Sequence, residues 1–159
     1  MRLRPGQSPF LPLTAYLLAM IPHPIRLRHP WDELPSRTPG RTVYRRLFKC
    51  PTGLDTWERV FLEVDRILFS GEITLNGQPI GRLESAQFFS ADITPLLQPA
   101  NELQVEVDPQ TAVTARDQVD APRQSPPSHS LYITDPNEPL GSPIGDVRLL
   151  IRTVHPSDQ

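Results

Sequence analysis

Short runs in which apolar and polar residues alternate dominate the sequence. Val60, Leu62 and Val64 form the clearest run, because polar residues occupy most of the positions around them. Successive side chains of a β-strand point to opposite faces, so a period of two predicts a strand with one buried face. We expect strands of this kind within 24–28, 41–48, 58–65, 73–76, 79–83, 102–107 and 147–151.

Two turn signals separate these runs. Asn76-Gly77 lies between two β-like segments, and both central residues of a type I′ turn need a positive φ, which Asn and Gly adopt readily. We therefore predict a tight hairpin there. Pro95 follows Thr94, so we expect Thr94 to cap a helical turn whose first position is Pro95.

Proline is unusually frequent, at 20 of 159 residues, and long helices tolerate it poorly. Many of the prolines fall within 109–143, which has few large apolar residues and which we expect to form a long loop. Short strands with one hairpin and no long helix predict an all-β fold, an antiparallel β-sandwich or jelly roll.

Charge excludes one class of partner. Sixteen Lys and Arg against eighteen Asp and Glu give a net charge of −2, whereas a nucleic-acid-binding domain normally has a basic surface. A lone Cys50 permits no internal disulfide.

The first 20 residues admit two interpretations. Arg2 and Arg4 precede an apolar stretch, as in a weak signal-like segment, but no clear cleavage site follows. Alternatively, Met20 is the true start and 1–19 are an extension. The stretch is too short and too interrupted to span a bilayer, and the sequence leaves open whether the chain is exported.

The order of the segments resembles that of a known family. The motifs that carry this resemblance are Tyr44–Phe48, Arg59–Asp65, Ile73–Gly81, Phe89–Leu97, Asn101–Val107 and Gly145–Leu150. In this order they resemble the N-terminal sugar-binding domain of family 2 glycoside hydrolases, the β-galactosidase and β-glucuronidase group. The resemblance implies one galactose-binding-like β-sandwich over about 21–155.

The resemblance also implies that the chain acts without catalysis. In that family two glutamates of a separate (β/α)₈ barrel perform hydrolysis, and such a barrel takes about 250 residues. We therefore expect a module of the carbohydrate-binding kind that is not an enzyme on its own. The alternatives are a protein-interaction or assembly domain and the non-catalytic piece of a split glycosidase.

Candidate catalytic and metal-binding residues are weak. Retaining glycosidases need two carboxyl groups about 5 Å apart, but most acids here, Glu63 among them, fall on strand faces that we expect to be solvated. The serines near His129 lack the strand-turn-helix setting of a nucleophile elbow. Galactose-binding-like domains often hold a structural calcium, but no tight Asp/Asn loop indicates one here. We expect no catalytic residue, metal or cofactor.

Aromatic side chains are the better candidates, because sugar rings present C–H faces that stack on them. We predict that a ligand would contact Trp57, Tyr44, Arg46, Asp55 and Tyr132. Core packing is the competing interpretation for Trp31 and Tyr44, and a position at the edge of the core competes for Trp57. The partners that we consider are a carbohydrate or another protein chain; we expect neither nucleic acid nor membrane.

Overall fold

The computed structural model describes residues 23–112 and 140–154. These residues form nine strands and two short 3-10 turns, and they include no helix long and apolar enough to cross a membrane. The elements are β1 (His23–Arg26), β2 (Asp32–Pro35), β3 (Thr42–Lys49), β4 (Glu58–Asp65), β5 (Gly71–Leu75), β6 (Gln78–Leu83), β7 (Phe89–Asp92), η1 (Thr94–Leu96), β8 (Ala100–Val107), η2 (Pro109–Thr111) and β9 (Asp146–Thr153).

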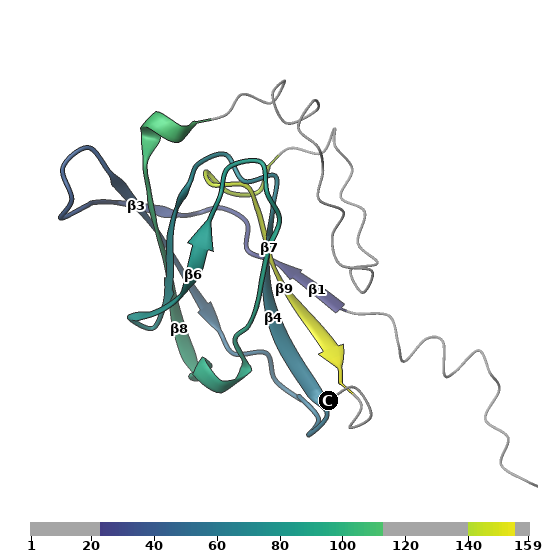
Figure 1. Cartoon of the computed structure of the whole chain (residues 1–159). Coiled ribbons are helices and arrows are strands. Elements are labelled where there is room, and N and C mark those ends of the chain that lie inside the picture. Colours follow the sequence, from purple (N-terminus) through teal and green to yellow (C-terminus); the bar gives the residue numbers. More distant parts are fainter. Residues whose placement is uncertain (1–22, 113–139, 155–159) are drawn as a thin grey trace, which may run out of the picture.

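The strands form two antiparallel sheets that face each other. One sheet has four strands in the order β1-β9-β4-β7, and the other has five in the order β2-β3-β8-β5-β6. The loop between β3 and β4 and the turn η1 lie at the lower end of the sandwich, whereas η2 lies at the upper end (Figure 1). The predicted all-β sandwich is confirmed.

The core lies between the two sheets and consists of alternate residues. In β4, Val60, Leu62 and Val64 are all 0% exposed, and the matching residues of β8 and β9 are buried with them. The period of two therefore identified the inner faces correctly. The buried residues of β8 and β9 that complete this layer are Leu103, Val105, Val107, Val147 and Leu149.

The predicted hairpin joins β5 and β6. Asn76 and Gly77 have φ values of 51° and 78°, and Leu75 pairs with Gln78 across the turn. Both central residues are thus left-handed, as a type I′ turn requires. The hairpin prediction is confirmed.

The role predicted for Thr94 is wrong in one respect. The residue that precedes η1 is Ile93, and no side chain caps the turn, although Pro95 does lie at its start. The Thr94 hydroxyl instead accepts a hydrogen bond from the Val60 N–H at 2.8 Å and donates to Asp92 Oδ1 at 2.6 Å. Thr94 therefore ties η1 to β4 rather than capping it.

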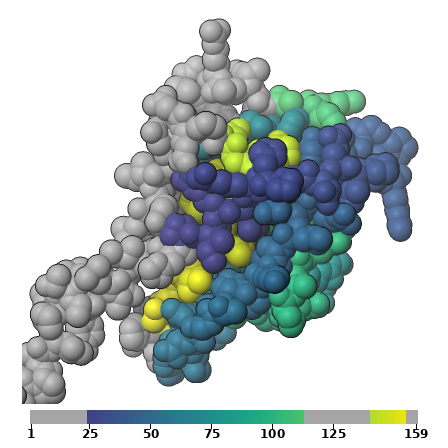
Figure 2. Space-filling model, turned by 180° about the vertical axis from the view of Figure 1, so that it is seen from behind, coloured from purple at the N-terminus to yellow at the C-terminus, as the bar shows by residue number. Residues whose placement is uncertain are grey.

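Strand β2 was not expected from the sequence. Its four residues include only one large apolar side chain, Leu34, so no alternation marks it. It becomes a strand by pairing with β3, where Asp32 lies opposite Arg45. The chain from β1 to β2 lies across the face opposite to the one seen in Figure 1, beside β9 (Figure 2).

Candidate functional site

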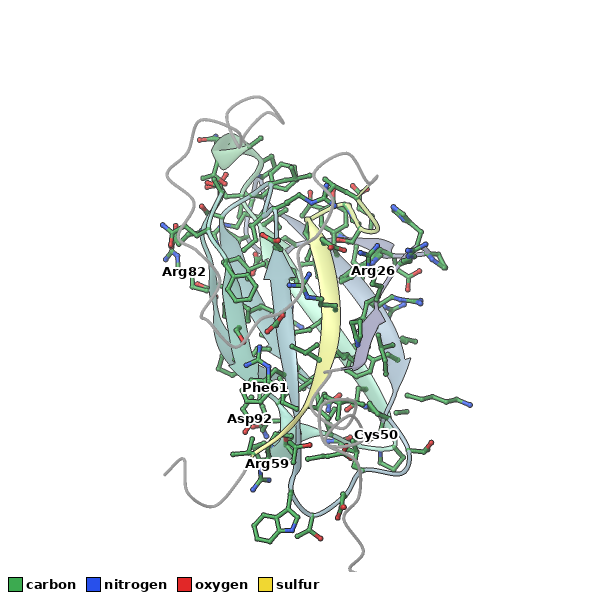
Figure 3. The ribbon with its side chains drawn as sticks, turned by 90° about the vertical axis from the view of Figure 1, so that its right-hand side faces the viewer. Arg26, Cys50, Arg59, Phe61, Arg82 and Asp92 are labelled. Atoms are coloured by element: carbon green, nitrogen blue, oxygen red, sulfur yellow. The ribbon has the colours of Figure 1, made fainter. Side chains whose placement is uncertain are left out.

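Two of the predicted contact residues, Asp55 and Trp57, lie in the loop that joins β3 to β4. Cys50 and Arg59, which flank this loop, lie at the same lower end of the sandwich (Figure 3). The Trp57 side chain is 52% exposed. The loop therefore presents a large aromatic surface to solvent.

Hydrogen bonds hold the backbone of this loop. The Asp55 N–H donates to Glu58 Oε2 at 2.8 Å, and the Glu58 N–H donates back to the Asp55 carbonyl at 3.0 Å. The Asp55 side chain accepts from the Thr56 N–H at 2.6 Å. The Trp57 carbonyl accepts from the Val154 N–H at 2.8 Å, which joins the loop to the end of β9. These contacts hold the backbone on both sides of Trp57.

Tyr44 and Arg46 lie elsewhere. They occupy alternate positions of β3 and pair with the core residues Val105 and Leu103, so they belong to the inner face of their sheet. Tyr44 is partly buried against the core, and burial, with a smaller contribution from the negative charge of Glu33, raises the pKa of its phenol. Arg46 donates to the Pro30 carbonyl at 3.1 Å.

The structure thus brings Asp55 and Trp57 together and places Tyr44 and Arg46 in a different environment. Tyr132 lies outside the described residues. Trp31, for which core packing was the competing interpretation, is partly buried against the core and donates from its indole N–H to the Leu27 carbonyl at 3.0 Å. Core packing is confirmed for Trp31 and Tyr44.

A groove that the sequence did not reveal lies at the same end of the sandwich, where β3 ends and β8 begins. Its volume is about 660 Å³, and its lining is mainly apolar. The Cys50 N–H donates to the Pro99 carbonyl at 3.2 Å, which joins the start of the loop between β3 and β4 to the segment before β8. The groove is lined by Leu47, Phe48, Lys49, Asn76, Gln98, Ala100, Asn101 and Glu102.

Only one signal in the sequence could have pointed to this groove. Leu47 alternates with Arg45 and Val43 on β3, which places it on the face away from the core, and it is 55% exposed. An apolar residue on an outward face is common, however. The opposite wall comes from β8 and the residue before it, far along the chain, namely Gln98, Ala100, Asn101 and Glu102, and Asn76 comes from the turn between β5 and β6. The approach of these residues depends on the pairing of β8 with β3 and β5.

The expectation that Glu63 is solvated is wrong. Glu63 lies on the outer face of β4, yet its side chain is 0% exposed. It accepts from Arg148 Nε at 3.0 Å and also from Arg152 Nη2. Arg152 in turn lies over the Phe61 ring, 4.6 Å from its centroid. A buried carboxylate with two guanidinium partners is a structural ion-pair network.

Metal ligation has no support in the described part of the chain. No group of three or more His, Cys, Asp or Glu side chains there is arranged to hold a metal ion. The features that remain are an exposed tryptophan in the loop between β3 and β4 and a groove where β3 ends and β8 begins. The two antiparallel sheets packed around one core define the class of the fold as a β-sandwich.

The sequence comparison gives the family. Residues 20–152 match the model of the glycosyl hydrolase 2 galactose-binding domain-like family, and the chain belongs to this family. The resemblance predicted from the order of the motifs is therefore confirmed. Among curated proteins, no sequence matches the chain.

Solved structures show the same fold. An FMN-binding β-glucuronidase from Faecalibacterium prausnitzii is 23% identical, with a TM-score of 0.53 over 84% of this chain and 23% of the enzyme. A Bacteroides uniformis β-glucuronidase is 18% identical, with a TM-score of 0.52 over 82% of this chain and 18% of the enzyme.

A third similar structure is a β-D-mannosidase from Dictyoglomus thermophilum. It is 16% identical, with a TM-score of 0.50 over 80% of this chain and 22% of the enzyme. The chain therefore spans less than a quarter of the length of each of these three enzymes. What these structures share with the chain is the fold of one part of each enzyme.

Proposed function

We propose that this protein is a non-catalytic carbohydrate-binding module in which Trp57 is the stacking surface. The observation that carries the proposal is the 52% exposure of the Trp57 side chain on a loop held by hydrogen bonds at both ends. The partly positive C–H face of a sugar ring packs well against the negative face of an indole. Family membership agrees with this chemistry.

The rigidity of the loop favours binding. When a ligand must order a mobile side chain or loop, the entropy lost in that ordering lowers the binding affinity. Here the Asp55 and Glu58 contacts have already fixed the backbone on both sides of Trp57. Asp55 is thus a positioning residue for Trp57, and its carboxylate is already used by the Thr56 N–H.

Binding without turnover is the expected behaviour. The one fully buried glutamate of the described residues, Glu63, is held between two arginines. Asp146 pairs with one of them, Arg148, so these buried carboxylates are engaged in a structural ion-pair network. We expect nitrophenyl glycosides to be hydrolysed no faster by the protein than by buffer. Hydrolysis that copurifies with the protein through two further columns would contradict this.

A glycan array followed by calorimetry tests the proposal. We expect the wild-type domain to bind at least one class of oligosaccharide, Trp57→Ala to abolish binding and Trp57→Phe to retain part of it. Ile25→Ala is the matched control, because Ile25 is a large apolar residue with 41% exposure on β1. Unchanged binding by Trp57→Ala, with thermal melting showing that it folds, would refute the role of Trp57.

A protein-interaction role is the second candidate. Three large apolar residues are exposed to solvent, namely Ile25, Leu47 and Trp57. Exposed residues of this kind can serve as anchors of an interface. This includes a role as the non-catalytic piece of a split glycosidase. A folded domain that binds no glycan and forms a stable complex with a separately encoded catalytic barrel would favour this candidate over the first.

A further inference from the structure

The groove between the end of β3 and the start of β8 has the composition of a small ligand site. Its volume of about 660 Å³ falls within the roughly 300–1,000 Å³ that is usual for ligand pockets. Its floor includes Leu47, which is 55% exposed, and Ala100, which pairs with Lys49 across the two strands. The floor is therefore apolar and reachable from solvent.

The walls of the groove are held in place by a network of two asparagines. Asn76 Nδ2 donates to the Leu96 carbonyl and to Asn101 Oδ1, both at 3.0 Å, and Asn76 Oδ1 accepts from the Glu102 N–H at 2.9 Å. Asn101 Nδ2 donates to the Gln98 carbonyl at 2.7 Å. Both amides are thus used within the protein and shape the groove rather than contact a ligand.

The polar groups left for a ligand are Lys49, Gln98 and Glu102. No ion pair joins Lys49 to another of the described residues. Glu102 is partly used, since Oε1 accepts from Gln104 Nε2 at 2.5 Å and Oε2 lies 3.8 Å from Arg45 Nη1. An ammonium only donates hydrogen bonds, a carboxylate only accepts them and an amide does both.

This set of groups matches a sugar without charge. Each sugar hydroxyl both donates and accepts, so it can use the donor of Lys49 and the acceptor of Glu102 together. The charges of Lys49 and Glu102 cancel, and Arg45 is also paired with Asp32 at 2.8 Å. The groove therefore offers an anionic ligand no net positive charge.

We propose that this groove is a subsite for an uncharged pyranose whose C–H face lies on Leu47 and Ala100 and whose hydroxyls contact Lys49, Gln98 and Glu102. This inference rests on the proposed carbohydrate-binding function and adds to it a second contact region and a ligand class. An acidic sugar or an acidic peptide would be recognised by net positive charge, which the groove lacks.

The Lys49 side chain can be followed by a single NMR signal, because Lys49 is the only lysine in the sequence. Reductive methylation with ¹³C-formaldehyde keeps its charge and gives one ε-amine signal, beside that of the terminal α-amine. We would titrate this sample with neutral gluco-, galacto- and manno-configured oligosaccharides, with their uronic-acid counterparts and with an acidic peptide. The inference predicts a saturable shift of the Lys49 signal with a neutral sugar and an unmoved α-amine signal.

Variants then separate this inference from the proposed function. We expect Leu47→Ser to weaken neutral-sugar binding about tenfold, and Glu102→Gln to weaken it less. Val43→Ser, on the same outward face of β3 but outside the groove, should bind within about twofold of wild type.

The outcomes that overturn the inference are distinct. Glycan binding that depends on Trp57 but leaves the Lys49 signal and the Leu47→Ser affinity unchanged would refute the groove and leave the proposed function standing. A Lys49 response only to the uronic-acid sugars or only to the acidic peptide would refute the ligand class. Failure of every glycan to bind would refute both proposals.

Discussion

Arg148 and Glu63 face each other across β9 and β4, with Arg148 Nε donating to Glu63 Oε2 at 3.0 Å. The side chains are 1% and 0% exposed. Asp146 Oδ2 lies 3.7 Å from the same guanidinium. An outer face of the sandwich therefore contains a buried ion-pair network instead of solvated charges.

Removing one partner of this network should destabilise the fold strongly. Breaking a buried ion pair typically costs about 3–5 kcal/mol, because the remaining charge stays buried without its partner. We expect Arg148→Met to lower the free energy of unfolding by about 3 kcal/mol, measured by urea denaturation. The double variant Glu63→Leu with Arg148→Met should recover only part of this loss, because Asp146 loses Arg148 and Arg152 loses Glu63 as partners.

Arg82→Met is the matched control. Arg82 Nε lies 2.9 Å from Glu84 Oε1, but the two side chains are 67% and 46% exposed, and exposed pairs contribute less than about 1 kcal/mol. An Arg148→Met variant that loses no more stability than Arg82→Met would contradict the structural role of the buried network.

Within the β5–β6 hairpin, substitution of Asn76 should lower the free energy of unfolding most. Its side chain makes the three hydrogen bonds to Leu96, Asn101 and Glu102, and its backbone is left-handed with a φ of 51°. Because partners left without hydrogen bonds cost about 1–3 kcal/mol each, we expect Asn76→Ala to lower the unfolding free energy by about 3 kcal/mol.

Gln78→Ala provides the comparison for Asn76→Ala, since Gln78 is the exposed residue that follows the same turn. It should change stability by less than about 0.5 kcal/mol. Equal losses in the two variants would show that the asparagine network does not hold this end of the sandwich.

Gly71 leaves no room for a side chain. A Cβ atom built at Gly71 would lie 2.3 Å from the Glu106 carbonyl oxygen of the neighbouring strand β8, and backbone cannot move aside as a flexible side chain can. Overpacking of this kind costs about 1–3 kcal/mol, so we expect Gly71→Ala to lower the thermal midpoint clearly. At Gly81 the neighbour is the Phe89 ring, which can rotate, so Gly81→Ala should cost less.

The stability of the sheet should depend on pH through Glu106. The Ser36 hydroxyl, which donates to Glu106 Oε1, is the main reason that the pKa of this carboxyl lies below its usual value of 4.5, with Thr38 and Arg41 adding to the effect. A pKa lowered by folding stabilises the protein above the unfolded-state value, and that contribution is lost as the pH falls through the folded-state value.

NMR titration of the Glu106 side-chain carbon measures this directly. We expect Ser36→Ala to move the pKa of Glu106 upward toward its usual value and to reduce the loss of stability between about pH 5 and pH 3. If the pKa of Glu106 is the same with and without the Ser36 hydroxyl, the hydrogen bond does not stabilise the carboxylate.

Alternation along the chain predicted the sandwich because the inner faces of β4 and β8 follow a strict period of two, and Asn76-Gly77 predicted its hairpin from local backbone preference alone. Both features depend on residues close together in the sequence. The same pattern led to the wrong prediction that Glu63 is solvated. Alternation separates the two faces of a strand but does not say whether the outer face is covered.

The groove and strand β2 could not be predicted because both depend on the pairing of strands. Leu47 and Ala100 meet only through the register of β3 with β8, and β2 exists only because it pairs with β3. The turn-rich segment before Trp57 indicated a loop at an end of the sandwich, and the structure places Trp57 in the loop between β3 and β4. Its contact with a ligand stays a prediction.

Tryptophan fluorescence tests the central claim, that Trp57 stacks on a sugar. The sequence has two tryptophans, so a Trp31→Phe variant leaves Trp57 as the single emitter. The account predicts that titration with the oligosaccharide selected by the array produces a saturable blue shift of this emission, with the same affinity as calorimetry. An emission maximum that stays unchanged while calorimetry records saturable binding would contradict it.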